Sequence, residues 1–256
     1  MGSNLVSLVR DLQRRRGRKR RALTVAEGIR LVEEALSAGV TVRGALVTAS
    51  ATAGARGAAL VASLAAHAIP VELVEDALFG ELADTENPQG VLAVIDPRRW
   101  SLTDVTPARR APVLVLDGVQ DPGNVGNLVR TAFALGAAGT LMLRGTADTA
   151  NPKVVRAAMG ATFKFPIVPL SDGEFTTWVA REGIEVWSAA TEGTPFARAA
   201  VPDRLAIVVG NEGAGVRPHL RAVASRQVAI PLARGAESLN VAVAAGILLH
   251  EVVRGA

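Results

Sequence analysis

The sequence predicts an α/β protein made of two parts. Short apolar runs alternate with segments of helical spacing along most of the chain, which is typical of strands that alternate with helices. The run VLVLDGV at 113–119 is unbroken and apolar, as expected of a buried parallel strand. Between the two parts, the stretch 97–112 holds three prolines and four arginines without periodicity. This stretch predicts a linker or domain edge.

The first part is predicted to be a small α/β domain of residues 1–97, followed by a linker at 98–111. Thr24–Glu27 has the spacing of a capping box, so we expect a helix from there to about Ala38. Its apolar positions recur at helical spacing. The other expected elements are strands at 42–48, 69–75 and 89–96, an alanine-rich helix ending near His67, and a helix at 76–82.

The second part is predicted to be a catalytic domain of residues 112–256. Its strands alternate with helices, so we expect a mostly parallel sheet with helices on both faces. The expected strands are 113–119, 139–144, 166–169, 184–189, 205–209 and 227–231. The expected helices lie within 121–136 and at 152–160, 173–182, 217–224 and 238–253.

Composition excludes several classes of protein. Cysteine is absent, and the three histidines are scattered without metal-ligand spacing, so we expect neither disulfides nor a metal site. The longest apolar run, at 241–249, is too short to cross a bilayer, and the N-terminus lacks the apolar core of a signal peptide. We therefore expect a cytoplasmic protein with no membrane partner.

The net charge is +4, and the local excess is concentrated in RDLQRRRGRKRR at 10–21. An exposed cluster of this kind attracts polyanions, and the arginine fork binds phosphate through two hydrogen bonds. The alternative is a solvated helix face or a disordered tail. The density of arginine favours a nucleic-acid surface.

Three polar clusters follow predicted strands, on the side where open α/β sheets bind ligands. The first cluster, 117–132, places Asn124, Asn127 and Arg130 on one stripe of a helix. Such a stripe suits a phosphate or a sugar. The alternative is an ordinary tight turn followed by a surface arginine, because the segment also contains the proline and glycine of a turn.

The other two clusters are a glycine-rich loop at 207–218 and a polar entry to an apolar helix at 235–251. The loop matches neither the GxGxxG fingerprint nor a P-loop. In the third cluster Ser238 is either a helix cap or a ligand contact, and Val241 stands where a capping box needs Glu or Gln. Together the two clusters offer backbone groups and few charges, which suits a neutral or zwitterionic cofactor. A Ser-His-Asp triad is disfavoured because Ser238 lacks the GxSxG context.

Taken in order, the three clusters resemble the signature motifs of the SpoU/TrmH family of RNA ribose methyltransferases, within the SPOUT superfamily. The matching stretches are LDGVQDPGNVGNLVRTA, VVGNEGAG and IPLARGAESLNVAVAAGILLHE. Between them, the segment with Lys153, Arg156 and Met159–Ala161 is similar to the middle part of the family. Towards the N-terminus, KRRALTVAEGIRLVEEAL and PQGVLAV resemble the family's substrate-binding domain, which is like ribosomal protein L30e.

This resemblance implies S-adenosylmethionine as the cofactor, a homodimer, and a deep C-terminal trefoil knot in the catalytic domain. It implies that Gly210, Ile230 and Leu239 contact the cofactor mainly through their backbones. The other residues expected to line the same pocket are Asn211, Glu212, Ser238 and Asn240, with Thr191 at the end of a strand.

The implied catalytic residues are Arg130, Asn124, Glu212, Ser238 and Asn240. Arginine is almost always protonated, so we expect Arg130 to stabilise a developing alkoxide or a neighbouring phosphate rather than to act as a base. Asn124 and Glu212 are expected to position the ribose and Arg130, while Ser238 and Asn240 order the substrate and the loop. Asn127 departs from the small residue more usual in the family, and we expect it to tune substrate choice.

The predicted reaction is methyl transfer to a ribose 2′-hydroxyl of RNA, with 23S rRNA as the leading substrate because of the N-terminal domain. The alternative enzyme is a tRNA 2′-O-methyltransferase. The alternative from another class is a non-catalytic RNA-binding or ribosome-assembly protein, which the intact set of catalytic-type residues disfavours. A role in antibiotic resistance through ribosome methylation stays open.

Overall fold

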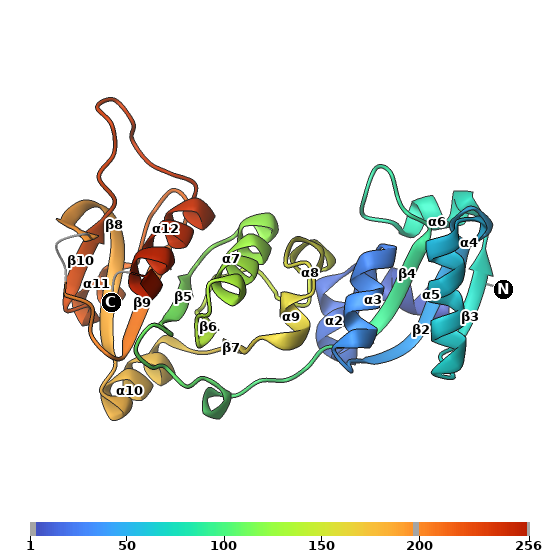
Figure 1. The fold of residues 1–256 in the computed structure, drawn as a ribbon, viewed down its shortest axis with the longest axis horizontal. Coiled ribbons are helices and arrows are strands. Elements are labelled where there is room, and N and C mark those ends of the chain that lie inside the picture. Colours follow the sequence, from blue (N-terminus) through green and yellow to red (C-terminus); the bar gives the residue numbers. More distant parts are fainter. Residues whose placement is uncertain (1–3, 197–199, 255–256) are drawn as a thin grey trace. The chain divides into compact units, whose positions relative to one another are not determined.

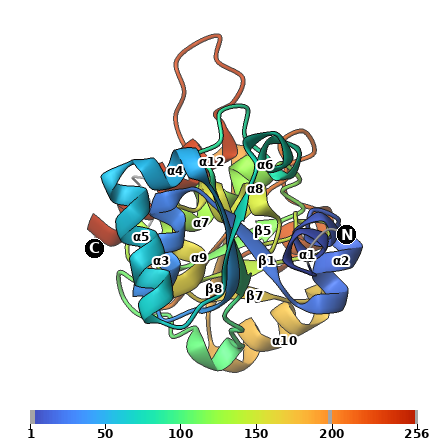
Figure 2. The same ribbon diagram turned by 90° about the vertical axis from the view of Figure 1, so that its right-hand side faces the viewer.

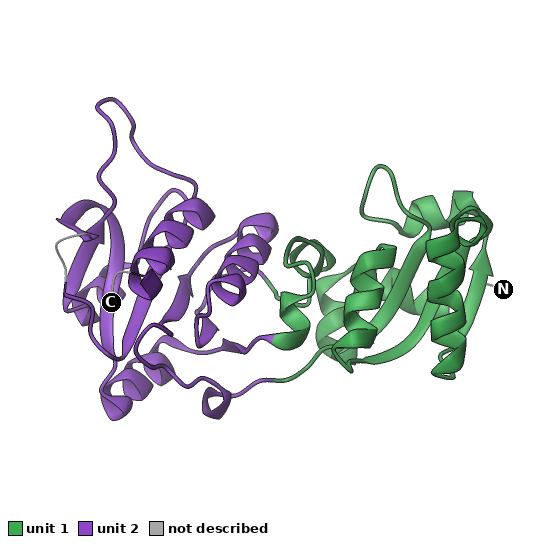
Figure 3. Cartoon of the chain, viewed as in Figure 1, with its two compact units in different colours: residues 1–99, 148–164 green, residues 100–147, 165–256 purple. Residues whose placement is uncertain are grey.

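The computed structural model describes residues 4–196 and 200–254 of the 256-residue chain. The chain divides into two compact units, each with its own β-sheet (Figure 3). Unit 1 comprises residues 1–99 and 148–164, and unit 2 comprises residues 100–147 and 165–256. The segment 148–164, which the sequence prediction assigns to the second domain, therefore belongs to unit 1, and the predicted linker falls mostly in unit 2.

Unit 1 is a four-stranded sheet with helices packed on it (Figure 1). The strand order is β1-β4-β2-β3, in which β2 and β3 are parallel and the other neighbours are antiparallel. Its elements are α1 (Asn4–Leu12), α2 (Arg15–Arg21), β1 (Thr24–Glu27), α3 (Ile29–Ser37), β2 (Thr41–Thr48), α4 (Ala49–Ala53), α5 (Ala55–Ala66), β3 (Val71–Val74), α6 (Asp76–Leu82), β4 (Val91–Asp96), α8 (Pro152–Ala157) and α9 (Ala161–Lys164).

Alternate side chains of this sheet enter two separate cores, as the two-residue period of a strand requires. Ala45 and Val47 of β2 are buried with residues of α3 and α5, whereas Leu46 is buried with residues of α1 and α6. Figure 2 shows α3 and α5 on one side of the sheet and α1 on the other. Both faces of the sheet are therefore covered.

The predicted start of the first-domain helix is wrong. Thr24–Glu27 is the buried strand β1, antiparallel to β4, and α3 begins only after it. The side chains that suggested a capping box have other partners: Thr24 Oγ1 donates to the Ala150 carbonyl at 2.6 Å, and Glu27 accepts the Asp84 N–H at 2.9 Å. Strand pairing and these distant partners override the local capping signal.

The segment 148–164 joins unit 1 because its side chains complete that unit's core. Val155 of α8 and Phe163 of α9 are buried with the apolar residues of α3 and α5. Two ion pairs add to the attachment, since Arg156 pairs with Asp84 at 2.9 Å and Lys164 Nζ lies 2.5 Å from the carboxylate of Glu34. No local pattern in the sequence reports such long-range contacts.

The basic cluster 10–21 forms the end of α1 and all of α2, and it is exposed only in part. The Arg18 side chain is 6% exposed, and its Nε donates to Asp148 at 3.1 Å. In contrast, Arg15, Arg16 and Lys19 are exposed, and within the described residues none of them pairs with a carboxylate. The cluster therefore consists of one buried anchor, Arg18, and an outward cationic face on α2.

Unit 2 is a six-stranded sheet in which every neighbouring pair of strands is parallel. The strand order is β10-β8-β9-β5-β6-β7. Its elements are η1 (Leu102–Asp104), β5 (Val113–Asp117), α7 (Pro122–Ala134), β6 (Gly139–Met142), β7 (Ile167–Pro169), α10 (Asp172–Glu182), β8 (Glu185–Pro195), β9 (Leu205–Gly210), α11 (Pro218–Val223), β10 (Arg226–Ala229) and α12 (Val241–Arg254). The predicted α/β class with a mostly parallel sheet flanked by helices is confirmed.

Helices pack on both faces of the unit 2 sheet. Helices α10 and α11 are buried through Trp178 and Leu220 against a core that includes Val113 and Val115 of β5. The intervening residue Leu114 points to the opposite side and is also fully buried. Helices α7 and α12 pack against each other and contact β6 and β9, respectively. This leaves the carboxyl ends of the central strands as the place where polar loops meet.

Candidate cofactor and catalytic site

One cavity of about 660 Å³ in unit 2 collects most of the predicted site residues. Its lining comes from the middle of β8, the end of β9 and the loop after it, β10 and the segment after it, and the start of α12. A cavity of this size is in the usual range for small-molecule sites. Its lining consists of residues 189–191, 209–216 and 237–241, together with Arg221, Val228, Ile230, Leu232, Ala244 and Leu248.

All five residues expected to bind the cofactor line this cavity: Gly210, Asn211, Thr191, Ile230 and Leu239. Three of the five expected catalytic residues, Glu212, Ser238 and Asn240, line it as well. Asn124 and Arg130 are not part of the lining. The structure thus brings Thr191 and residues from the second and third motifs to one cavity, while the roles assigned to them remain predictions.

A chain of hydrogen bonds links one residue from each motif. Asn240 Nδ2 donates to Asn124 Oδ1 at 3.0 Å, and Asn124 Nδ2 donates to Glu212 Oε1 at 3.0 Å. The carboxylate only accepts, so it fixes which way the Asn124 amide points, and that amide in turn presents its oxygen to Asn240. Asn124 therefore belongs to the site through its two partners, although it lies outside the cavity lining.

Asn240 also caps helix α12, so it holds the cap position that was one of the two alternatives for Ser238. Asn240 Oδ1 accepts the Ala242 N–H at 2.9 Å, and the Asn240 carbonyl accepts the Ala244 N–H at 2.9 Å. The helix begins at Val241 rather than at residue 238. Ser238 is exposed and lines the cavity instead. Either residue type suits a cap, so the sequence alone did not distinguish them.

The Glu212 carboxylate is held in its ionised form. Partial burial acts to raise the pKa of Glu212, but hydrogen bonds from the Asn124 side chain and from the backbone N–H groups of Glu212, Gln120 and Asp121 outweigh it and hold the pKa below its ordinary value. At neutral pH Glu212 is therefore a strong acceptor and a weak base. This favours a role in orientation over a role in proton abstraction.

The loop that follows β9 is tightly closed at its base. The Asn211 N–H donates to the Gly215 carbonyl at 3.1 Å, and the Gly215 N–H donates back to the Asn211 carbonyl at 2.9 Å. A Cβ on residue 210 would lie 2.1 Å from the Gly215 carbonyl carbon, so only glycine allows this approach. Gly210, one of the glycines that gave a weak motif signal in the sequence, is thus required by the backbone packing.

The predicted polar stripe lies on α7. Asp121 Oδ1 accepts the Asn124 N–H at 2.7 Å and caps the helix, as expected of an acid in this turn. Asn124 is half-buried, while Asn127 and Arg130 are exposed. Within the described residues Arg130 makes no ion pair, so its guanidinium is open to an anionic ligand.

Sequence reasoning missed several residues of this region. Val228, Leu232, Ala244 and Leu248 supply apolar cavity wall, and nothing in the sequence separates such residues from ordinary core. It also missed Arg217, which follows the loop and donates to the buried carboxylate of Asp117. The partner of Arg217, Asp117, lies 100 residues away in the sequence, so this pair leaves no local signal.

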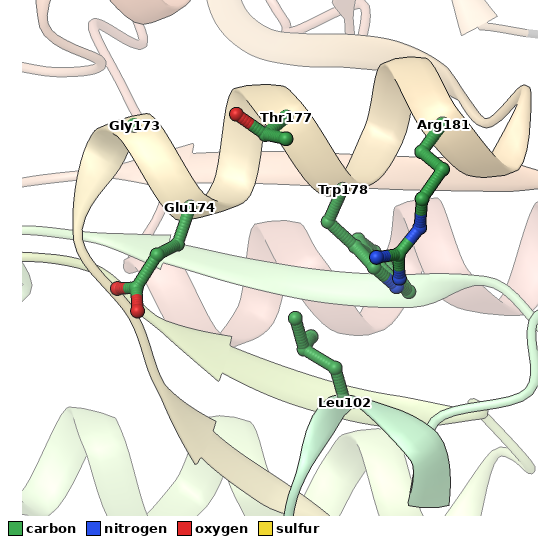
Figure 4. A pocket seen from close by; sticks show the side chains of 6 residues that line it. All are labelled: Leu102, Gly173, Glu174, Thr177, Trp178 and Arg181. Atoms are coloured by element: carbon green, nitrogen blue, oxygen red, sulfur yellow. The ribbon is translucent and has the colours of Figure 1, made fainter.

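A second cavity of about 340 Å³ lies beside α10 in unit 2. Figure 4 shows Trp178 and Arg181 of α10 extending toward the side of Leu102. None of the predicted site residues lines it. In the described ranges no cluster of acidic, histidine or cysteine side chains has the arrangement of a metal site. No helix among the described residues is long and apolar enough to span a membrane.

The chain matches the models of two protein families. The model of the SpoU rRNA Methylase family matches residues 111–250, and that of the MRM3-like substrate binding domain matches residues 4–93. The chain belongs to the SpoU rRNA methylase family. A similar curated relative is the 23S rRNA (guanosine(2553)-2′-O)-methyltransferase RlmP of Bacillus subtilis, which is 34% identical over 248 residues, 95% of each chain.

Two solved structures of this family are similar over nearly the whole chain. The AdoMet-bound rRNA methyltransferase from Sinorhizobium meliloti has a TM-score of 0.86 and 30% identity, covering 99% of this chain and 95% of its own. The SpoU methyltransferase AviRb from Streptomyces viridochromogenes, in complex with AdoMet, has a TM-score of 0.87 and 28% identity, covering 99% and 98%. Two AdoMet-bound methyltransferases therefore share this fold over nearly the whole chain.

Proposed function

We propose that this SpoU-family chain transfers a methyl group from S-adenosylmethionine to a ribose 2′-hydroxyl of 23S rRNA. The observation that carries the proposal is the cavity of about 660 Å³, which residues of the second and third motifs line. The Asn240–Asn124–Glu212 hydrogen bonds connect this cavity to the first motif on α7. The named rRNA 2′-O-methyltransferases among its relatives support the substrate class. Ribosomal RNA as substrate makes the cytoplasm the expected place of action.

The cavity fits the chemistry of S-adenosylmethionine. Apolar side chains such as Val228, Leu232 and Leu248 form part of its wall, and its polar groups include the loop backbone of 210–215. A zwitterionic cofactor with an aromatic base and a sulfonium needs such a mixture and no lysine-rich phosphate site. Gly210, Ile230 and Leu239 are the residues that would hold it, mainly through backbone groups.

The convergence of three chain segments on this cavity also supports the trefoil knot. Residues 209–216 are the end of β9 and the loop after it, and residues 230–241 run from the end of β10 to the first residue of α12. Thr191 belongs to β8, which lies between β9 and β10 in the sheet. We infer that α12 is threaded through the loop formed by these segments. The L30e-like identity of unit 1 is inferred in the same way, from its motifs and its α/β topology.

In the proposed reaction the cofactor supplies a methyl group that the positive sulfonium has already activated. The protein must then align the ribose and stabilise the 2′-oxygen as its proton passes to water, while the cofactor leaves as the neutral thioether. Asn124, fixed by Glu212 and Asn240, orients the ribose. Arg130 lies six residues after Asn124 on α7. It stabilises the developing negative charge on the 2′-oxygen or an adjacent phosphate, because its guanidinium cannot act as a base near neutral pH.

Ala244→Trp tests the cofactor site directly. Ala244 lines the cavity from the first turns of α12, so an indole there fills part of its volume. We expect S-adenosylmethionine binding, measured by isothermal titration calorimetry on the full chain, to be lost while the circular dichroism of the fold is retained. Binding at wild-type strength would contradict this site.

Unit 1 is proposed to dock the RNA through α2. Arg15, Arg16 and Lys19 face solvent without a carboxylate partner in the described part of the chain, whereas Arg18 is held inside by Asp148. Buried Arg18 fixes the helix, so the outward cations form a preorganised surface for a phosphate backbone.

Replacing these three cations by glutamine is expected to weaken RNA binding. The slope of log affinity against log salt should fall by about two to three, since each phosphate contact contributes about 0.7 to 0.9. The matched control replaces Arg10, Arg43 and Arg56, which are paired with Glu81, Asp96 and Glu33. Filter binding at several salt concentrations compares the variants, and an equal loss in both would contradict a specific role for α2.

The overall proposal is tested by methyl transfer to bulk rRNA and tRNA, with mapping of the positions that become resistant to alkaline cleavage. Methylation of 23S rRNA is the expected result. Methylation of tRNA alone would instead support the alternative tRNA enzyme. RNA binding without S-adenosylmethionine binding would support a non-catalytic RNA-binding or ribosome-assembly protein.

A further inference from the structure

An ion pair between buried Asp117 and Arg217 lies at the end of the loop 211–216, which lines the proposed cofactor cavity. The Asp117 side chain is fully buried at the carboxyl end of β5. Its Oδ2 accepts the backbone N–H of Arg217 at 2.7 Å, and its Oδ1 accepts Arg217 Nε at 2.5 Å. One carboxylate therefore holds both the backbone and the side chain of the residue that ends the loop.

Asp117 and the next residue, Gly118, also hold the start of the loop 211–216. Asn211 Nδ2 donates to the Gly118 carbonyl at 3.0 Å, and Gly210 lies opposite Asp117 in the β5–β9 register. Residues 211–216, which line the cavity, are thus fixed at both ends to Asp117 and Gly118. Between these ends the loop is mostly exposed, so its conformation depends on how its base is anchored.

Arg217 is itself anchored from the far side. Its Nη1 and Nη2 donate to the two carboxylate oxygens of Asp172, both at 2.8 Å, and His219 Nε2 lies 3.0 Å from the same carboxylate. Asp172 is the first residue of α10. A planar guanidinium with donors on several edges can satisfy two carboxylates at once, and lysine cannot reproduce this geometry.

We propose that Asp117 and Arg217 are positioning residues for S-adenosylmethionine, which rests on the proposed assignment of the main cavity to that cofactor. They anchor the end of the loop 211–216 so that its backbone groups are in place before the cofactor binds. Neither side chain lines the cavity, so the effect passes through the loop. Preorganisation of this kind strengthens binding by reducing the ordering that binding requires.

Arg217→Met tests the proposal because it keeps the apolar stem and removes the guanidinium. We expect the dissociation constant for S-adenosylmethionine and the KM for it to rise about tenfold or more, with kcat at saturating cofactor changing by less than about threefold. In hydrogen exchange, the amides of 211–216 should exchange faster while those of β5 and β9 stay protected. An unchanged dissociation constant would overturn the proposal.

Arg204→Met is the matched control. Arg204 is also a partly buried arginine of unit 2, and it donates to the Glu182 carbonyl and carboxylate, with no contact to the loop. We expect a lower thermal midpoint for this variant and an unchanged dissociation constant. If both variants lose affinity in proportion to their loss of thermal stability, Arg217 has a merely structural role and the positioning role is rejected.

A conservative variant keeps the test decisive if Arg217→Met does not fold. Arg217→Lys retains the charge but can serve only one of the two carboxylates, so its dissociation constant should rise by about threefold, between those of the wild type and Arg217→Met. An Arg217→Lys protein that binds as the wild type would overturn the proposal. Ala244→Trp tests the assignment of the cavity to S-adenosylmethionine independently of the role of Arg217. If the assignment is correct, Ala244→Trp loses S-adenosylmethionine binding, whatever the result for the Arg217 variants.

Discussion

At the scale of single residues, the site depends on side chains that serve two partners at once. Asn124 both donates to Glu212 and accepts from Asn240, and Asp117 accepts from both the backbone and the side chain of Arg217. In each case one group fixes the direction of another, which a single hydrogen bond does not do. Arg130 differs, because it makes no ion pair in the described part of the chain and its charge stays available for a ligand.

Arg130→Ala is therefore expected to separate binding from chemistry. Methyl transfer to rRNA should fall by about 100-fold to 1000-fold, the usual loss when one group that stabilises a developing anion is removed. The dissociation constant for S-adenosylmethionine, measured by calorimetry, should stay close to that of the wild type because Arg130 is outside the cavity lining. Wild-type turnover in this variant would contradict the assigned role.

At the scale of elements, one residue at the start of α12, Asn240, both caps the helix and bonds to the proposed catalytic site. Asn240 accepts the amide hydrogens of Ala242 and Val243 through Oδ1, while its Nδ2 donates to Asn124. The oxygen therefore serves the helix, and the nitrogen serves the site. A substitution that changes only one of these atoms can separate the two functions.

Asn240→Asp keeps the capping oxygen and replaces the donor by a second acceptor. We expect its stability toward urea to remain near that of the wild type, whereas methyl transfer falls because Asn124 loses its donor partner. Asn240→Ala should also lose activity, and its free energy of unfolding should drop by about 1 kcal/mol. Equal stability of the two variants would contradict the capping role.

The same elements explain what the sequence could predict and what it could not. Parallel strands end at one edge of a sheet, so the sequence predicts that the three polar clusters meet. The second and third clusters line one cavity, and the first joins them through the hydrogen bonds of Asn124. Thr24–Glu27 was wrongly assigned to a helix because its burial and pairing with β4 depend on residues some 70 positions away. For the same reason Arg217 carried no signal, since its partners Asp117 and Asp172 are brought to it only by the fold.

At the scale of the whole molecule, we infer that two copies associate through the α7 and α12 region. Val243 is 52% exposed and Ile247 38% exposed, one turn apart on α12, and Phe133 on α7 is 44% exposed. Exposed apolar groups on two helices that pack together favour a covering partner, and a second copy of this chain fits the homodimer implied by the family.

Val243→Arg combined with Ile247→Arg should convert the dimer to a monomer in sedimentation velocity, because charges at such a contact would be buried unpaired. The control is Leu73→Arg, which places a charge on an equally apolar residue that is 65% exposed in unit 1. The control protein should sediment as the wild type does. A wild-type chain that is monomeric at all concentrations would contradict the inferred assembly.

Because residues 148–164 belong to unit 1, the chain cannot be cut into its two units at a single position. The polypeptide passes between the two units at 99–100, at 147–148 and again at 164–165. A fragment that starts at residue 112 would carry α8 and α9 without the partners of Val155 and Phe163, leaving two apolar side chains to water. An exchange of unit 1 between relatives at the level of the gene would have to replace residues 1–99 and 148–164 together. The two units are therefore expected to be inherited together rather than recombined.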